Sequence, residues 1–202
     1  FQFRPGPIFA QIVLTDEIFS HMVYSGAEHK TIAAVEGMAD RSILVDTFSK
    51  TYIMTGFRIG WCVASKEQIT AMDLFQQNSV TNVPAFVQLA ALAAITGPQD
   101  HVEVITRKLE GKRDRTVAAA NAMPGVECPT PDGSFYVFPD IRGTGMTAQQ
   151  FADHMIENHQ VGVVAGSAFG DRGEGHIRLT YACPDDVLEE GLDRIRQGVE
   201  NL

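Results

Sequence analysis

The sequence predicts an α/β protein, and three features of its 202 residues indicate that class. Short apolar runs of strand length recur along the chain, beginning with residues 12–14 and 42–45. Helix signals lie between and after these runs, such as Ser65, an N-cap residue followed three positions later by Gln68. A long helical segment at about 100–122 leads into a second, smaller α/β unit. With 45% apolar and 20% charged residues, the composition is that of an ordinary globular protein.

The first part of the chain is expected to alternate strands and helices. Its elements, in order, are a strand at 12–14, a helical turn at 31–38, strands at 42–45 and 60–64, and helices at 66–76 and 85–96. Ser65 and Gln68 form a capping box for the first of these helices. Pro84 opens the second helix, and Gly97 with Pro98 ends it.

The second part begins with the long helix, whose apolar residues are partly periodic and whose middle is charged. Further elements are strands at 126–128, 134–138, 161–164 and 176–181, and helices at 147–158 and 184–199. The charged middle of the long helix is interpreted as a solvated face, in preference to a nucleic-acid patch.

Charge and cysteine content exclude several classes of function. The net charge of −9 argues against nucleic acid or an anionic membrane as the main partner. The longest apolar stretch, 85–95, is too short to span a bilayer. Cys62, Cys128 and Cys183 are odd in number and widely spaced, so we expect a reducing cytoplasm and neither a zinc site nor a disulfide framework.

The stretch 47–61 carries the most specific chemical signal in the chain. Lys50 follows the buried run 42–45, and Arg58 comes eight residues later. Ligands of α/β sheets bind just beyond the carboxyl ends of strands, where a lysine can form a Schiff base with an aldehyde. A guanidinium group and the hydroxyls of Thr47 and Ser49 could hold a phosphate. A lone lysine after a strand is usually a surface charge, but here both cations lie among apolar residues and are expected to be buried for a purpose.

This stretch resembles the pyridoxal-phosphate attachment site of class I/II aminotransferases of fold type I. That family reads Ser/Gly-x-Ser-Lys and then Gly-x-Arg-x-Gly, and this chain has Thr47-Phe48-Ser49-Lys50 and Gly56-Phe57-Arg58-Ile59-Gly60. Thr47 departs from the pattern but keeps a hydroxyl, and Ile53 stands where a small residue is usual. The resemblance implies that Lys50 carries pyridoxal 5'-phosphate as a Schiff base and that Arg58, Thr47 and Ser49 bind its phosphate.

Asp16 has two interpretations. An aspartate at the end of a strand commonly caps a turn or a helix. The phrase Asp16-Glu17-Ile18-Phe19 also resembles the family's Asp-Glu-x-Tyr, which implies that Asp16, as a buried carboxylate, pairs with the pyridine nitrogen of the cofactor. Phe19 replaces the usual tyrosine and cannot donate a hydrogen bond to the cofactor's 3' oxygen.

Arg178 lies inside a predicted strand, where an arginine is costly unless it is paired. One interpretation is that it neutralises a buried Asp or Glu. The other follows from the resemblance of 165–180 to the family's carboxylate-binding region, which implies that Arg178 holds the substrate α-carboxylate by a bidentate pair. His29 is interpreted as a surface-loop residue.

The resemblance covers about residue 14 to the end and implies two domains. Residues 1–110 would be the carboxyl-terminal part of a large domain with a mostly parallel sheet, and 111–202 the small carboxyl-terminal α/β domain. The chain has about half the length of a complete member, so we expect a truncated portion that turns over no substrate alone. A complete member would be a cytoplasmic homodimer.

The implied activity is transfer of an amino group from an amino acid to a 2-oxo acid, a reaction of amino acid metabolism. Two alternatives stay open: a pyridoxal-phosphate lyase or decarboxylase of the same fold, and the aminotransferase-like sensor half of a transcription regulator. The sensor interpretation requires a basic winged-helix segment upstream, which this acidic chain does not contain. Residues 76–84 contain no arginine, so a preference for dicarboxylate substrates gains no support.

Overall fold

The computed structural model describes residues 11–202, which divide into two compact units, the first ending at Glu103 and the second beginning at Val104. The first unit contains β1 (Val13–Asp16), η1 (Ile32–Ala34), η2 (Ala39–Arg41), β2 (Ser42–Thr47), α1 (Phe48–Thr51), η3 (Thr55–Phe57), β3 (Gly60–Val63), α2 (Lys66–Ser79) and α3 (Ala85–Thr96). The long helix α4 (Asp100–Asn121) begins in the first unit and continues into the second. The domain boundary expected at 110/111 lies within α4 and stays a prediction.

The second unit continues from α4 with short strands and two further α-helices. Its elements are β4 (Tyr136–Val137), η4 (Arg142–Thr144), α5 (Ala148–His159), β5 (Val164–Ala165), η5 (Gly166–Phe169), η6 (Asp171–Gly173), β6 (Ile177–Thr180) and α6 (Asp185–Glu200). No helix within 11–202 combines the length and the apolar character needed to cross a membrane.

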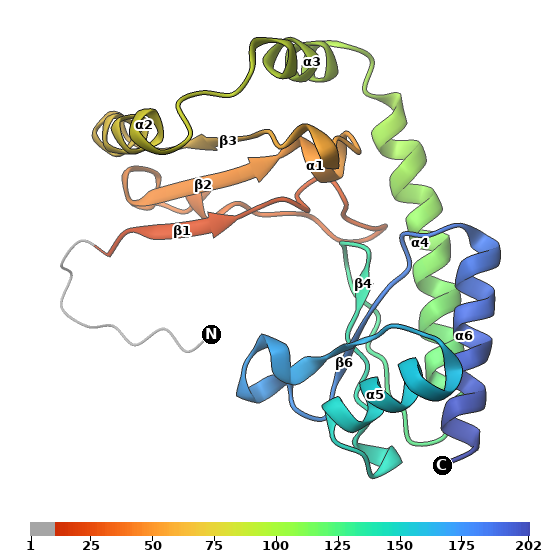
Figure 1. Ribbon diagram of the computed structural model, residues 1–202. Coiled ribbons are helices and arrows are strands. Elements are labelled where there is room, and N and C mark those ends of the chain that lie inside the picture. Colours follow the sequence, from red (N-terminus) through yellow and green to blue (C-terminus); the bar gives the residue numbers. More distant parts are fainter. Residues whose placement is uncertain (1–10) are drawn as a thin grey trace. The chain divides into compact units, whose positions relative to one another are not determined.

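The sheet of the first unit has the strand order β1-β2-β3. β1 pairs with β2 in parallel, whereas β2 pairs with β3 antiparallel, so these three strands form a mixed sheet. The register opposes Asp16 to Val45 and Thr47 to Gly60. The carboxyl ends of β1 and β2 and the amino end of β3 therefore share one edge, and α1 continues directly from β2 at that edge (Figure 1).

Local signals account for both helices that follow β3. Ser65 and Gln68 form the predicted capping box, with each backbone N–H donating to the other residue's side chain at 2.9 and 3.3 Å. The helix α2 extends to Ser79, beyond the predicted end at 76, because no Gly or Pro interrupts it there. Pro84 and Gly97 bound α3 as expected.

The core of the first unit joins the turn after β2 to α3. Phe48, Met54, Ile59, Val87 and Ala91 form one buried cluster. The apolar residues around Lys50 therefore serve mainly to anchor the Lys50 turn on α3.

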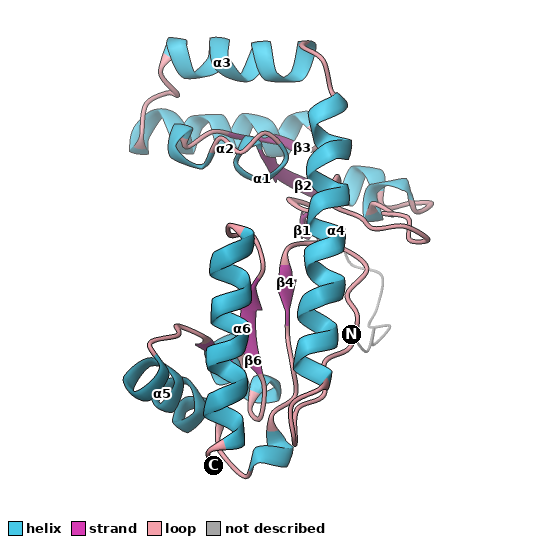
Figure 2. Cartoon of the chain, turned by 90° about the vertical axis from the view of Figure 1, so that its right-hand side faces the viewer, coloured by secondary structure: helices cyan, strands magenta, loops and turns pink. Residues whose placement is uncertain are grey.

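The second unit packs helices against an antiparallel sheet of order β4-β6-β5. Helices α4 and α6 lie side by side along β4 and β6 (Figure 2), and Arg115 of α4 pairs with Asp185 and Glu189 of α6. Its fully buried side chains include Ile141, Phe151, Met155, Ile177 and Tyr181.

Three predicted strands of this unit are shorter than expected, and the fourth is absent as a strand. β4 begins only at Tyr136 because Ser134 has the left-handed φ of 70°, which breaks an extended strand. β5 begins at Val164, three residues later than predicted, and β6 is one residue shorter at each end, at Ile177–Thr180. Residues 126–128 form a single bridge, between Glu127 and Asp140. The backbone N–H and C=O of Cys128 bond to the side-chain amide of Asn121 and not to a neighbouring strand.

Candidate active site

One edge of the first sheet gathers three of the residues that the sequence singled out. Asp16 ends β1, Lys50 lies in α1 directly after β2, and Arg58 comes just before β3. Because the register brings these strand ends together, residues more than 40 positions apart in the sequence share one edge. This is the position at which α/β sheets bind ligands.

Hydroxyl groups hold the turn that carries Lys50. Thr47 is the N-cap of α1, where its Oγ1 accepts a hydrogen bond from the backbone N–H of Ser49 at 3.1 Å. The same oxygen lies 2.9 Å from Ser49 Oγ and 3.0 Å from the carbonyl oxygen of Ile59. Lys50 is half-buried. In the neighbouring Thr51, Oγ1 is buried without a hydrogen-bond partner among the described residues.

Arg58 is exposed, and the expectation that it would be buried is wrong. Its backbone has the left-handed φ of 53°, so the chain turns sharply just before β3. The guanidinium donates one hydrogen bond, from Nη1 to the carbonyl oxygen of Thr55 at 3.0 Å. Within residues 11–202 it forms no ion pair, so its remaining donors are available to an anion. Strained backbone of this kind concentrates at functional sites.

Asp16 is exposed in this chain, whereas the role expected for it is that of a buried carboxylate. Its Oδ1 accepts a hydrogen bond from the backbone N–H of Ile18 at 3.2 Å. Asp16 thus caps the turn after β1, as the first interpretation of this residue expects, and its second carboxylate oxygen can still accept from a cation.

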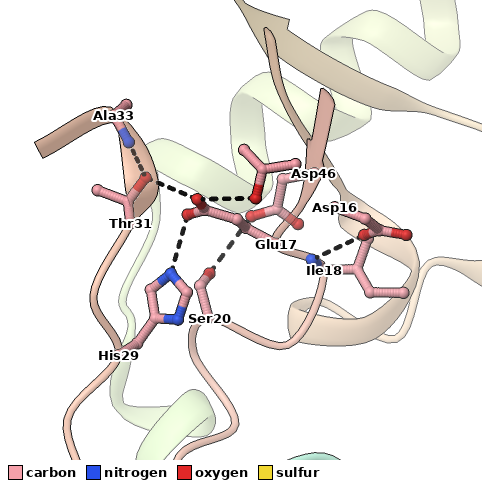
Figure 3. A network of polar contacts seen from close by, with 9 residues as sticks. Asp16, Glu17, Ile18, Ser20, His29, Thr31, Ala33 and Asp46 are labelled. Atoms are coloured by element: carbon pink, nitrogen blue, oxygen red, sulfur yellow. Dashed lines mark hydrogen bonds and ion pairs between the residues drawn. The ribbon is translucent and has the colours of Figure 1, made fainter. Parts of the chain in front are cut away.

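Sequence reasoning missed a buried glutamate behind this edge. Glu17 is only 7% exposed, and its carboxylate contacts Thr31 Oγ1 at 2.6 Å, His29 Nε2 at 2.8 Å and Thr15 Oγ1 at 3.3 Å (Figure 3). His29 lies at an exposed position in a loop, as predicted, and its ring also pairs with this buried charge. The sequence gives one hint of this buried carboxylate: two polar side chains, His29 and Thr31, lie two positions apart.

The pKa of Glu17 lies below its ordinary value. Burial alone raises it, but hydrogen bonds from Thr31 and His29, together with the charge of His29, outweigh that effect. Asp46, at the end of the neighbouring strand β2, shows the opposite balance, because burial raises its pKa despite a hydrogen bond from the backbone N–H of Thr47. Two buried carboxylates, one with a lowered and one with a raised pKa, thus lie behind this edge of the sheet.

The Glu17→Gln substitution is expected to destabilise the first unit by about 2 kcal/mol at pH 7, because it removes charge-assisted hydrogen bonds. A carboxylate with a lowered pKa stabilises the fold above its unfolded-state pKa, and that contribution disappears as the pH falls through its folded-state pKa. The difference between parent and variant should therefore shrink below about pH 4.5. Urea titrations at several pH values, followed by the fluorescence of the single tryptophan, Trp61, measure this difference. A pH-independent difference would contradict the assignment.

In the second unit, Arg178 lies at the centre of β6, on a sheet face that carries aromatic rings. Its Cζ atom is 4.5 Å from the ring centre of Tyr136 and 4.7 Å from that of Phe169. Among the described residues Arg178 forms no ion pair, so it does not neutralise a buried Asp or Glu there. The N–H groups of its guanidinium are therefore available to an anionic ligand.

Comparison with known proteins identifies the family. The family model for aminotransferase class I and II matches residues 10–195. The chain therefore belongs to the class I and II aminotransferases.

Individual relatives show the same relationship. The chain is 38% identical over 188 residues to an aspartate aminotransferase of Pyrococcus abyssi, and 37% identical over 188 residues to aromatic-amino-acid aminotransferase 2 of Thermococcus litoralis. In each case the match covers 92% of this chain and 48% of the relative. The chain thus spans about half the length of these relatives.

A solved structure confirms the predicted fold. The aromatic aminotransferase of Pyrococcus horikoshii matches with a TM-score of 0.91 and 38% identity, over 94% of this chain and 51% of that one. The predicted fold, that of pyridoxal-phosphate-dependent transferases of fold type I, is therefore confirmed.

Proposed function

We propose that these residues serve pyridoxal-phosphate-dependent transfer of an amino group from an amino acid to a 2-oxo acid. The observation that carries the proposal is the meeting of Asp16, Lys50 and Arg58 at one edge of one sheet, in a chain of the aminotransferase family. Two matched relatives are named for aspartate and for aromatic amino acids, which supports the reaction and leaves the amino acid open.

The residues at this edge fit the cofactor. Lys50 offers an amine, and Arg58 offers an exposed guanidinium without an acidic partner in the described chain. Thr51 Oγ1, next to Lys50, is buried and has no hydrogen-bond partner among the described residues. Amine, guanidinium and hydroxyl are the groups that bind a phosphorylated aldehyde. When bound, pyridoxal phosphate supplies an electron sink that makes the substrate Cα–H bond acidic.

Each side chain then has a defined task. Lys50 Nζ takes the proton from the substrate Cα as a general base and later returns it. Asp16 would hold the ring of the cofactor by accepting a hydrogen bond from its protonated nitrogen. Arg58, Thr47 and Ser49 bind the phosphate, and Arg178 binds the substrate carboxylate through two parallel hydrogen bonds.

Covalent trapping tests the proposal without requiring turnover. The purified chain is incubated with pyridoxal phosphate, reduced with borohydride and digested, and the modified lysines are mapped by mass spectrometry. We expect the label on Lys50 at the lowest cofactor concentration that labels any lysine. A label spread evenly over Lys50 and exposed lysines such as Lys66 would contradict the proposal.

We further propose that the working protein is a cytoplasmic homodimer. The described cysteines Cys62, Cys128 and Cys183 are all free thiols, which supports a reducing compartment. Helix α3 contains no charged residue and exposes an apolar stripe made of Phe86, Leu89, Leu92 and Ile95. A helix that is apolar all round is normally covered on every side, which supports a second copy as the partner of this stripe.

The Leu89→Lys substitution is expected to weaken self-association, because it places a charge in the middle of the stripe. Sedimentation velocity at several concentrations would show a smaller average mass for this variant than for the parent chain. Thr70→Lys, at an exposed position of α2, provides the control and should associate like the parent. Equal association of L89K and the parent would contradict the role of the stripe.

A further inference from the structure

The surroundings of Arg178 suggest how its guanidinium is held. Tyr136, on the adjacent strand β4, and Phe169, in η5, each place a ring face against its Cζ atom, at 4.5 and 4.7 Å. Both distances are well inside the range of cation–π contact. A guanidinium stacks on an aromatic ring with its flat surface, so its N–H donors, which lie in the plane at its edges, stay available.

A second layer of rings supports Phe169, which is 51% exposed and would otherwise move freely. Phe138 meets Phe169 edge to face, with 5.9 Å between ring centres. Phe138 also stacks on His176 at 5.3 Å with an angle of 10° between the rings. The Nδ1 of His176 contacts the carbonyl oxygen of Glu174 at 3.1 Å, which fixes the imidazole.

The loop that carries Phe169 is itself tightly held. Gly166 and Gly173 approach so closely that a Cβ atom on Gly166 would lie 2.1 Å from the carbonyl oxygen of Gly173. The backbone N–H of Gly166 also donates to the carbonyl oxygen of His176 at 2.8 Å. The loop that carries the ring of Phe169 is therefore held by backbone contacts at both of its ends, at Gly166 and at Gly173.

We propose that Tyr136 and Phe169 are positioning residues that hold Arg178 ready for a carboxylate. This inference rests on the proposed function, because it takes the ligand to be the α-carboxylate of an amino acid or a 2-oxo acid. An arginine loses much side-chain entropy when a ligand fixes it, and rings that restrict it beforehand reduce that loss. Bidentate pairing also requires the guanidinium to have one orientation.

The experiment follows the Nε–H resonance of Arg178 by nitrogen-15 NMR in the purified chain. Propanoate is the probe, titrated against sodium chloride at constant ionic strength. Phe169→Leu and Tyr136→Leu should each raise the propanoate dissociation constant by about threefold. Phe169→Tyr, which keeps a ring, should retain the parent's affinity. Phe75→Leu removes an exposed ring from the other unit and serves as the matched control.

Three outcomes are distinguishable. Weaker binding in F169L, with parental binding in F169Y and F75L, supports the inference. Equal dissociation constants for F169L, F169Y and the parent overturn the positioning role and leave Arg178 as a carboxylate ligand. If propanoate produces no saturable shift of Arg178 in the parent, the carboxylate role in the proposed function is wrong, and the positioning role is overturned with it.

Discussion

The Lys50→Ala variant is expected to lose covalent capture of pyridoxal phosphate, so that borohydride reduction labels it only at background level. Alanine has no amine to form the imine, and no other lysine lies in the turn between β2 and β3. Two measurements report the loss. The visible absorbance of the imine is recorded before reduction, and peptide mapping locates the label after it. Because Lys50 is half-buried on a four-residue helix, this substitution should change the stability of the first unit little.

Two further variants show whether the loss is specific to Lys50. Lys66→Ala removes an exposed lysine at the first position of α2 and should be labelled at Lys50 like the parent. Lys50→Arg keeps a positive charge but cannot form an imine, so it should behave like Lys50→Ala. Persistent labelling of residues near the sheet edge in Lys50→Ala would mean that another lysine binds the cofactor.

The Gly166→Ala variant is expected to destabilise the second unit by about 3 kcal/mol, because the new methyl group overlaps backbone atoms that cannot move independently. Its Cβ would lie 2.1 Å from the carbonyl oxygen of Gly173 and 2.6 Å from that of His176. For a unit of this size the thermal midpoint should fall by more than about 10 °C. Circular dichroism follows this transition, since Trp61 belongs to the first unit and reports only on that unit.

Gly162→Ala is the matched control, because it adds the same methyl group four residues earlier in the same unit. A Cβ atom at Gly162 would meet no atom within 4 Å. Its stability should stay within about 1 kcal/mol of the parent, since alanine is compatible with that backbone. Equal midpoints for G166A and G162A would show that the loop after β5 can relax, and the support it provides to Phe169 would then be weaker than the structure indicates.

Local signals in the sequence predicted much of this structure. The capping box at Ser65 and the Pro84 start of α3 both depend on residues within a few positions, so their geometry is readable from the chain. At the candidate site, the sequence predicted some features and missed others. The spacing of Lys50 and Arg58 pointed to the turn, but neither the left-handed backbone of Arg58 nor its exposure could be read from the sequence.

By itself, the sequence determined the family, the order of the elements and the position of Lys50 directly after a strand, because these depend on short-range patterns. The strand was expected to be buried, but its apolar residues 43–45 are only partly buried. The tertiary structure alone decided that Glu17 is buried against His29 and Thr31, and that Arg178 lies against Tyr136 and Phe169. These contacts join side chains that are distant in the sequence. Strand register and loop closure bring such side chains together, and no local preference encodes either of these.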